Sequence, residues 1–217
     1  MLSGFPSNAR NIKLLHNDNK ITKEEAEHLL LFTHFSNPMF ILGTLCLILN
    51  NKSIGILILI SHYLPNFIIG ILLRKNNTKS IEIKDNTPHN NFGIIFTSSI
   101  KSSIDSLLNI LGILTIFLII STVIINFFKL NSINSLFIKS ILEITSGLKE
   151  LSKFNLNSKL LVIISSCILS FGGLSVHMQV INELSDTDIR YRNFFIGRIL
   201  QMTLSLIVSY IICLFTF

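Results

Sequence analysis

Three long apolar runs, each about the length that crosses a bilayer, constrain what this chain can fold into. They cover residues 54–73, 107–128 and 194–217. The hydrocarbon core of a bilayer needs roughly 20 helical residues, and each run supplies that length. Charged residues make up 14% of the chain, against about 25% in a soluble domain. The sequence therefore predicts an all-α, polytopic integral membrane protein rather than a soluble enzyme.

Two further apolar runs are interrupted near their middle by polar or flexible residues. The run 29–49 contains Pro38 after a polar stretch, and the run 160–181 contains Gly172 and Gly173. Proline removes a backbone donor from a helix, and glycine adopts backbone angles that other residues avoid. We therefore expect two broken helices at membrane depth.

The distribution of basic residues predicts which loops are cytoplasmic. The segments before residue 29, between 74 and 101, and between 182 and 198 hold every arginine and most of the lysines. Cytoplasmic loops of membrane proteins carry such an excess. Residues 74–106 are expected to form a cytoplasmic loop and an amphipathic surface helix, the latter at 92–104.

The two interrupted runs belong to an internal repeat. A shift of 139 positions places residues 32–39 on 171–178 and residues 4–9 on 143–148. The chain then reads as one membrane domain, 1–217, with repeat units at 1–73 and 129–217 and a separate span at 107–128. Because two full spans separate the units, the broken helices should cross in opposite directions. Such inverted repeats are typical of secondary transporters, whose broken helices surround the substrate.

A short apolar segment, residues 136–147, is predicted to form a re-entrant hairpin with Glu143 near its tip. An ionisable group within the membrane is a functional candidate, so Glu143 is expected to handle a proton or a cation. The alternative is an interfacial acid that pairs with Lys139 or Lys149.

The broken helices and the hairpin tips supply the candidate binding groups. The N-terminus of a half-helix carries unpaired N–H groups and a partial positive charge, which attract an anion. The alternative for each break is a kink packed against neighbouring helices, and His177 could equally be a packing residue. A kink at His62, Tyr63, Pro65 and Asn66 is either structural or lines the pathway. The candidate substrate-binding residues are Ser7, Asn8, Ser36, Asn37, Thr145, Ser146, Gly172, Gly173, Ser175 and His177.

Catalytic and metal-binding patterns do not stand out in the sequence. We find no nucleophile elbow, phosphate-binding glycine loop, HExxH or CxxC motif. Cys46, Cys167 and Cys213 are widely separated inside apolar runs, as expected of small buried side chains. The sequence predicts no enzyme, cofactor, metal or nucleic-acid partner.

Four motifs resemble the YlbJ family of sporulation integral membrane proteins. They are SGFPSNA at 3–9, FTHFSNP at 32–38, LEITSGL at 142–148, and FGGLSVHMQV at 171–180 followed by DTDI at 186–189. The resemblance implies a nucleoside-recognition (Gate) domain, distantly similar to concentrative nucleoside transporters. It also implies transport of dipicolinic acid from the mother cell across the outer forespore membrane, needed for spore maturation and cortex formation.

The chain departs from this family in two ways. Family members carry several spans before the SGFP motif, so the chain is expected to be an N-terminally truncated copy. Nucleoside transporters place a carboxylate in the first hairpin, whereas residues 4–9 have none; a small anionic solute fits better. The alternatives are a non-transporting structural component of a sporulation complex or a nucleoside-type carrier. Expected partners are membrane lipid, the solute, and other sporulation membrane proteins or a second copy.

Overall fold

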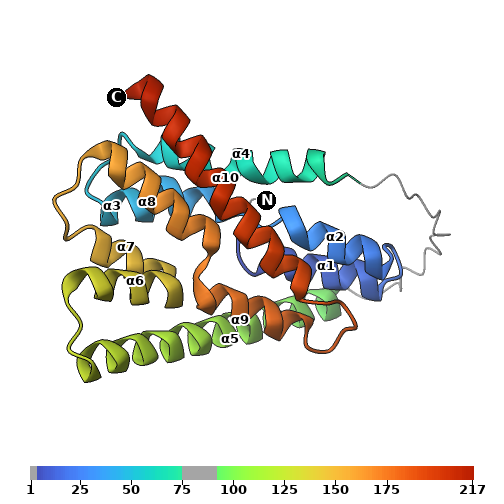
Figure 1. Ribbon diagram of the computed structural model, residues 1–217. Coiled ribbons are helices and arrows are strands. Elements are labelled where there is room, and N and C mark those ends of the chain that lie inside the picture. The colour runs from blue at the N-terminus through green and yellow to red at the C-terminus, as the bar shows by residue number, and fades with distance from the viewer. Residues whose placement is uncertain (1–3, 75–91) are drawn as a thin grey trace.

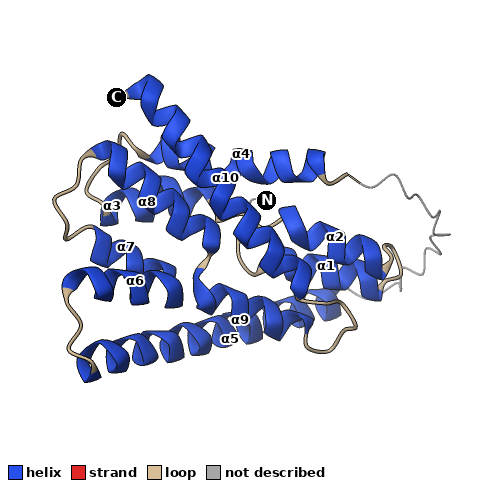
Figure 2. Ribbon diagram, in the orientation of Figure 1, coloured by secondary structure: helices blue, strands red, loops and turns tan. Residues whose placement is uncertain are grey.

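The computed structural model describes residues 4–74 and 92–217, and this part of the chain is helical without strands (Figure 1, Figure 2). Four helical segments are long and apolar enough to cross a membrane: Gly55–Leu72, Phe92–Phe127, Ser158–Leu184 and Arg192–Thr216. The prediction of an all-α polytopic membrane protein is confirmed. The elements are α1 (Ser7–Asn17), α2 (Lys23–Phe32), the π-helical η1 (Phe40–Leu45), α3 (Cys46–Ile48), α4 (Gly55–Leu72), α5 (Phe92–Phe127), α6 (Ser132–Leu142), α7 (Ile144–Leu151), α8 (Ser158–Phe171), α9 (Gly173–Leu184) and α10 (Arg192–Thr216).

Both predicted helix breaks are present. The first separates α2 from η1 at residues 33–39, where Pro38 disfavours helical angles at the preceding residue. The second is the single residue Gly172 between α8 and α9, with φ of 91° and a further positive φ of 64° at Gly173. Left-handed angles of this kind are strained for residues with a Cβ. The inverted relation of the two repeat units stays a prediction.

The predicted hairpin is formed by α6 and α7, which pack against each other with Glu143 between them. The two helices have 11 and 8 residues, too few to cross a bilayer. Gly147 makes their close approach possible, because a Cβ there would lie 2.6 Å from the Cα of Ser140.

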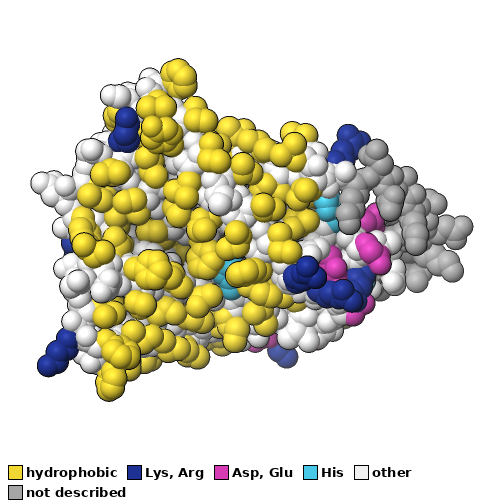
Figure 3. Space-filling view, in the orientation of Figure 1, with side chains coloured by type: hydrophobic (Ala, Val, Ile, Leu, Met, Phe, Trp, Pro, Cys, Tyr) yellow, Lys and Arg dark blue, Asp and Glu magenta, His cyan; other side chains and the backbone are white. Residues whose placement is uncertain are grey.

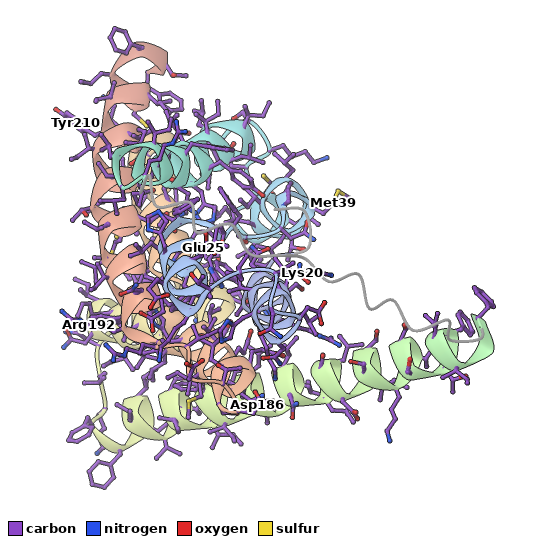
Figure 4. The ribbon with its side chains drawn as sticks, turned by 90° about the vertical axis from the view of Figure 1, so that its right-hand side faces the viewer. Lys20, Glu25, Met39, Asp186, Arg192 and Tyr210 are labelled. Atoms are coloured by element: carbon purple, nitrogen blue, oxygen red, sulfur yellow. The ribbon has the colours of Figure 1, made fainter. Side chains whose placement is uncertain are left out.

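The expected boundary between a surface helix at 92–104 and a span at 107–128 is wrong. Both belong to α5, one helix of 36 residues, because no glycine or proline interrupts the chain between them. At 1.5 Å per residue, α5 is roughly 54 Å long and exceeds the hydrocarbon thickness of about 30 Å. Figure 4 shows its N-terminal part extending away from the other helices. The predicted loop at 75–91 lies outside the described residues.

The helix α10 holds the membrane domain together. It crosses the molecule and packs against α8, α4 and α2. Hydrophobic side chains cover most of the face shown in Figure 3, and charged side chains gather at the end where α1, α2 and the α9–α10 connection lie. The apolar face contacts lipid, and the polar elements at the helix breaks lie inside.

Candidate functional site at the two helix breaks

The tip before α1 lies against the first helix break. A Cβ on Gly4 would be 3.1 Å from the backbone nitrogen of Asn37. The Nδ2 of Asn8 donates to the carbonyl oxygen of Thr33 at 2.7 Å, and the Oδ1 of Asn37 accepts from the backbone of Met39 at 2.7 Å. The structure therefore brings Asn8 and Asn37 to one break, where each bonds to backbone. Ser7 begins α1 beside them.

The backbone of the first break is bonded to side chains of α4. The N–H of Ser36 donates to Nε2 of His62 at 2.9 Å, and the Ser36 carbonyl accepts from the hydroxyl of Tyr63 at 2.8 Å. The carbonyl of His34 accepts from Nδ2 of Asn66 at 2.7 Å. The backbone amide of Ser36 is therefore already paired, because α4 packs directly against the break.

The tip of the α6–α7 hairpin lies against the second break. A Cβ on Gly173 would be 3.3 Å from the backbone nitrogen of Ile144 and 3.4 Å from the Cα of Glu143. The Glu143 carboxylate is buried and accepts from the backbone N–H groups of Thr145 at 2.8 Å and Ser146 at 2.7 Å. Glu143 thus caps the N-terminus of α7.

Lys139 does not pair with Glu143 as one alternative predicted. Its Nζ lies 2.6 Å from Oε2 of Glu150, which also contacts Lys153 at 3.0 Å. Each oxygen of the Glu143 carboxylate accepts one backbone N–H of α7, from Thr145 or from Ser146.

Two candidates on α9 have different surroundings. Nε2 of His177 lies 3.0 Å from the carbonyl oxygen of Phe171. A carbonyl only accepts, so Nε2 carries the proton, and in the neutral ring Nδ1 accepts from the hydroxyl of Tyr191. His177 therefore bonds the backbone of the second break. The hydroxyl of Ser175 is buried and has no hydrogen-bond partner.

His62 links the two breaks. Because the Ser36 amide can only donate, Nε2 of His62 is the acceptor and the proton resides on Nδ1. Nδ1 lies 3.1 Å from the hydroxyl of Ser170, two residues before Gly172, and donates to it. The polar kink of α4 is thus the structural bridge between two interrupted helices.

Arg198 is the functional candidate that the sequence analysis missed. Counting it with the basic residues of a cytoplasmic loop was wrong, because it lies inside α10 and is 0% exposed. The signal was its position inside an apolar run, where an ionisable residue is a functional candidate. Nη1 donates to the carbonyl of His34 at 2.9 Å and to Oε1 of Gln201, and Nη2 lies 3.5 Å from Oδ1 of Asn66.

Charged and aromatic groups meet around the ring of Phe194. The Cζ of Arg198 lies 5.3 Å from its centroid. The rings of His34 and His177 lie 4.7 Å and 5.1 Å away, both edge-on. We call Arg198, Gln201, His34, His62 and Asn66 the Arg198 cluster.

Several buried polar atoms of the described residues have no hydrogen-bond partner. They include both ring nitrogens of His34, Nε of Arg198, and the hydroxyls of Ser61, Ser165, Ser166 and Ser175.

Within residues 4–74 and 92–217, no group of three His, Cys, Asp or Glu side chains could hold a metal ion. The three cysteines are free thiols.

Comparison with known proteins gives one curated relative. The chain is 32% identical over 93% of its length to the sporulation integral membrane protein YlbJ of Bacillus subtilis (strain 168). It spans 59% of the length of that relative. No family model matches the sequence, and no solved structure matches the fold. The similarity extends along nearly the whole chain and includes the membrane-spanning helices, so over the part that it spans this protein is similar to the YlbJ family of sporulation integral membrane proteins.

Proposed function

We propose that this protein is a carrier, or the solute-binding part of one, that moves a small carboxylate anion across a membrane during sporulation. The proposed solute is dipicolinic acid, and the proposed location is the outer forespore membrane. The observation that carries this proposal is the fully buried guanidinium of Arg198, whose hydrogen-bond acceptors are all neutral.

A buried charge without an opposite charge is costly. Moving an ion into the protein interior costs several kcal/mol even after relaxation. In the described part of the chain, the guanidinium of Arg198 donates to two neutral side chains and one backbone carbonyl. Its Nε has no hydrogen-bond partner. A carboxylate bound there would supply the missing charge and accept from Nε. This accounts for an arginine at a fully buried position of α10.

The surroundings of Arg198 suit a planar anion with two carboxylates. The Phe194 ring and the edges of His34 and His177 supply aromatic surface. On the same helix as His177, α9, Ser175 has a buried hydroxyl without a partner. The N-terminus of α9 has no side-chain cap, so its first amides favour negative charge. Ser36, Gly172, Thr145 and Ser146 then act by shaping the breaks and the hairpin tip.

The alternatives predict a different dependence on Arg198. A nucleoside is neutral and would not require a buried cation, so a Gate-domain nucleoside carrier is less favoured. A structural component of a sporulation complex would keep its role without moving any solute.

Uptake of radiolabelled dipicolinate into proteoliposomes tests the proposal. Removing a charged partner from a buried pair costs about 2–5 kcal/mol, so Arg198→Gln should weaken binding by at least roughly 30-fold. Arg198→Lys should retain part of the uptake, because it keeps the charge. The matched control is Arg192→Gln, at the exposed start of the same helix (Figure 4), which should transport like the wild type.

Two results would contradict the carrier. One is the absence of dipicolinate binding and uptake by well-folded wild-type protein. The other is normal dipicolinate accumulation in spores whose only copy carries Arg198→Gln, with normal membrane insertion. That second result would favour the structural role.

A further inference from the structure

We propose that His34 takes up one proton when the anion binds at Arg198, so that a proton travels with each anion. This inference rests on the carrier function proposed above. It assigns the coupling role to an imidazole of the first helix break, and not to Glu143, whose position in the sequence first suggested such a role.

The backbone of His34 is fixed while its ring is unpartnered. The carbonyl of His34 accepts from Asn66 at 2.7 Å and from Arg198 at 2.9 Å. The ring is 0% exposed, and neither of its nitrogens has a hydrogen-bond partner. It lies against Phe194 and stacks on Phe5 with centroids 6.4 Å apart. A buried donor or acceptor that lacks a hydrogen bond costs about 1–3 kcal/mol. This ring is therefore suited to a hydrogen-bond partner that arrives with the solute.

The other two histidines nearby cannot take a proton so simply. The ionisable groups of the described residues that act on His34 are Arg198 on α10 and His177 on α9. His62 on α4 bonds the backbone of Ser36, two residues further along the break. Nε2 of His62 accepts the Ser36 amide, and Nδ1 of His177 accepts the Tyr191 hydroxyl. Protonation of His62 would break the bond that holds the first helix break. Protonation of His177 would require the Tyr191 hydroxyl to turn from donor to acceptor. The free nitrogens of His34 carry no such constraint.

Charge explains why the anion and the proton would bind together. In the empty site, the guanidinium of Arg198 disfavours a second positive charge on His34. A bound dicarboxylate neutralises Arg198 with one negative charge and stabilises an imidazolium with the other. Arg198 and protonated His34 then balance the two charges of the anion. The proton comes from water on the side where the anion enters and leaves to water on the other side, so one net negative charge moves per cycle.

Glu143 is less suited to this role. Both of its oxygens accept backbone N–H groups at the start of α7, so uptake of a proton would cost the helix its cap. It also lies against the second break, whereas the unpaired nitrogens of His34 lie on the first break beside Arg198.

The experiment compares two modes of dipicolinate uptake by the same proteoliposomes. In exchange, unlabelled dipicolinate inside is replaced by labelled dipicolinate with equal pH on both sides. In driven uptake, an inward gradient of one pH unit is applied with the membrane potential clamped at zero. With one proton per anion, this gradient can drive about tenfold accumulation. The variants are His34→Asn and, as matched control, His16→Asn on α1, whose ring pairs with Asp188.

We expect wild type and His16→Asn to show both modes, and His34→Asn to keep exchange while losing accumulation. Exchange by His34→Asn also shows that this variant is folded. In a weakly buffered solution with a pH-sensitive dye, dipicolinate binding should remove one proton per anion from solution with wild type and none with His34→Asn.

The possible failures are distinguishable. Wild-type exchange without accumulation, or accumulation retained by His34→Asn, would overturn proton coupling through His34 and leave the carrier standing. Absence of wild-type exchange would overturn the carrier itself. If His34→Asn lost exchange as well, while still binding dipicolinate without proton uptake, its ring would be needed for the transport step and the proton count would still support the assignment.

Discussion

The imidazole of His62 accepts a hydrogen bond from the backbone N–H of Ser36 at 2.9 Å, although His62 lies on α4 and Ser36 in the first helix break. Its other nitrogen donates to Ser170 at the end of α8. One side chain therefore satisfies polar groups at both breaks. In lipid, irregular backbone survives only where protein or water supplies such partners.

Replacement of His62 by phenylalanine should destabilise the protein. His62→Phe leaves the Ser36 amide and the Ser170 hydroxyl unpaired in the interior, at a cost of about 1–3 kcal/mol each. Tyr63→Phe is the control, since it removes one hydrogen bond to the Ser36 carbonyl, worth about 0.5–1.5 kcal/mol. Thermal unfolding in detergent can be followed with a thiol-reactive dye at the buried Cys46 and Cys213. Equal melting temperatures of the two variants would contradict the bridging role.

Gly197 should tolerate no side chain. A Cβ there would lie 2.8 Å from the backbone Cα of Leu31, so Gly197→Ala forces α2 and α10 apart at a cost of about 1–3 kcal/mol or more. Gly112→Ala on α5 is the control, because no described atom lies within 4 Å of its Cβ. Alanine should there stabilise the helix by about 0.5–1 kcal/mol. Yield and melting temperature of purified protein check both, and a normal melting temperature for Gly197→Ala would refute the close contact.

The connection between α9 and α10 should loosen in acid. Lys13 hydrogen-bonds Asp186 at 2.7 Å and lowers its pKa, and His16, followed by Lys23, lowers the pKa of Asp188. A lowered pKa in the folded state stabilises the fold above the unfolded value of about 3.9, and this contribution disappears as the pH falls through the folded values. The effect is small because both carboxylates are exposed.

Melting temperatures between pH 7 and pH 3 measure this contribution. The double variant Asp186→Asn, Asp188→Asn should show a weaker decline at low pH than the wild type. Asp105→Asn, at an exposed site on α5, should behave like the wild type. Identical pH profiles for the double variant and the wild type would show that these ion pairs do not hold the connection.

Glu143 should act as a helix cap. Glu143→Ala removes both acceptors for the amides of Thr145 and Ser146, and loss of an N-cap costs about 0.5–2 kcal/mol. Glu143→Gln keeps one amide oxygen and should cost less. In driven dipicolinate uptake, Glu143→Gln should still accumulate the anion. Loss of accumulation with retained exchange would instead assign the proton to Glu143.

The breaks and the hairpin were predictable because they depend on local chemistry. Pro38 and the pair Gly172 and Gly173 disfavour a regular helix wherever the chain places them. The segment between Lys129 and Leu160 is too short for two full spans, which leaves a hairpin. The continuity of α5 was not predicted, because Lys101 and the serines around it favour a helix on the membrane surface, separate from the span that follows.

Arg198 was not assigned correctly because its sequence position is ambiguous. It follows Arg192 by six residues, and a loop with two arginines is typical of the cytoplasmic side. The helix begins at Arg192, which puts Arg198 roughly 9 Å further along its axis. Only the packing of α10 against α2 and α4 buries the guanidinium.

The sequence by itself determined that the chain spans a membrane and where its helices are interrupted, because apolar length and backbone preference are properties of neighbouring residues. The tertiary structure decided which polar groups at those interruptions are satisfied and which are left free. His62 bonds the Ser36 amide, while the His34 ring and Nε of Arg198 have no partner. The physical reason is that hydrogen bonds at the breaks join groups of α4, α8, α9 and α10 across the interior. Whether such a bond forms depends on how the helices cross.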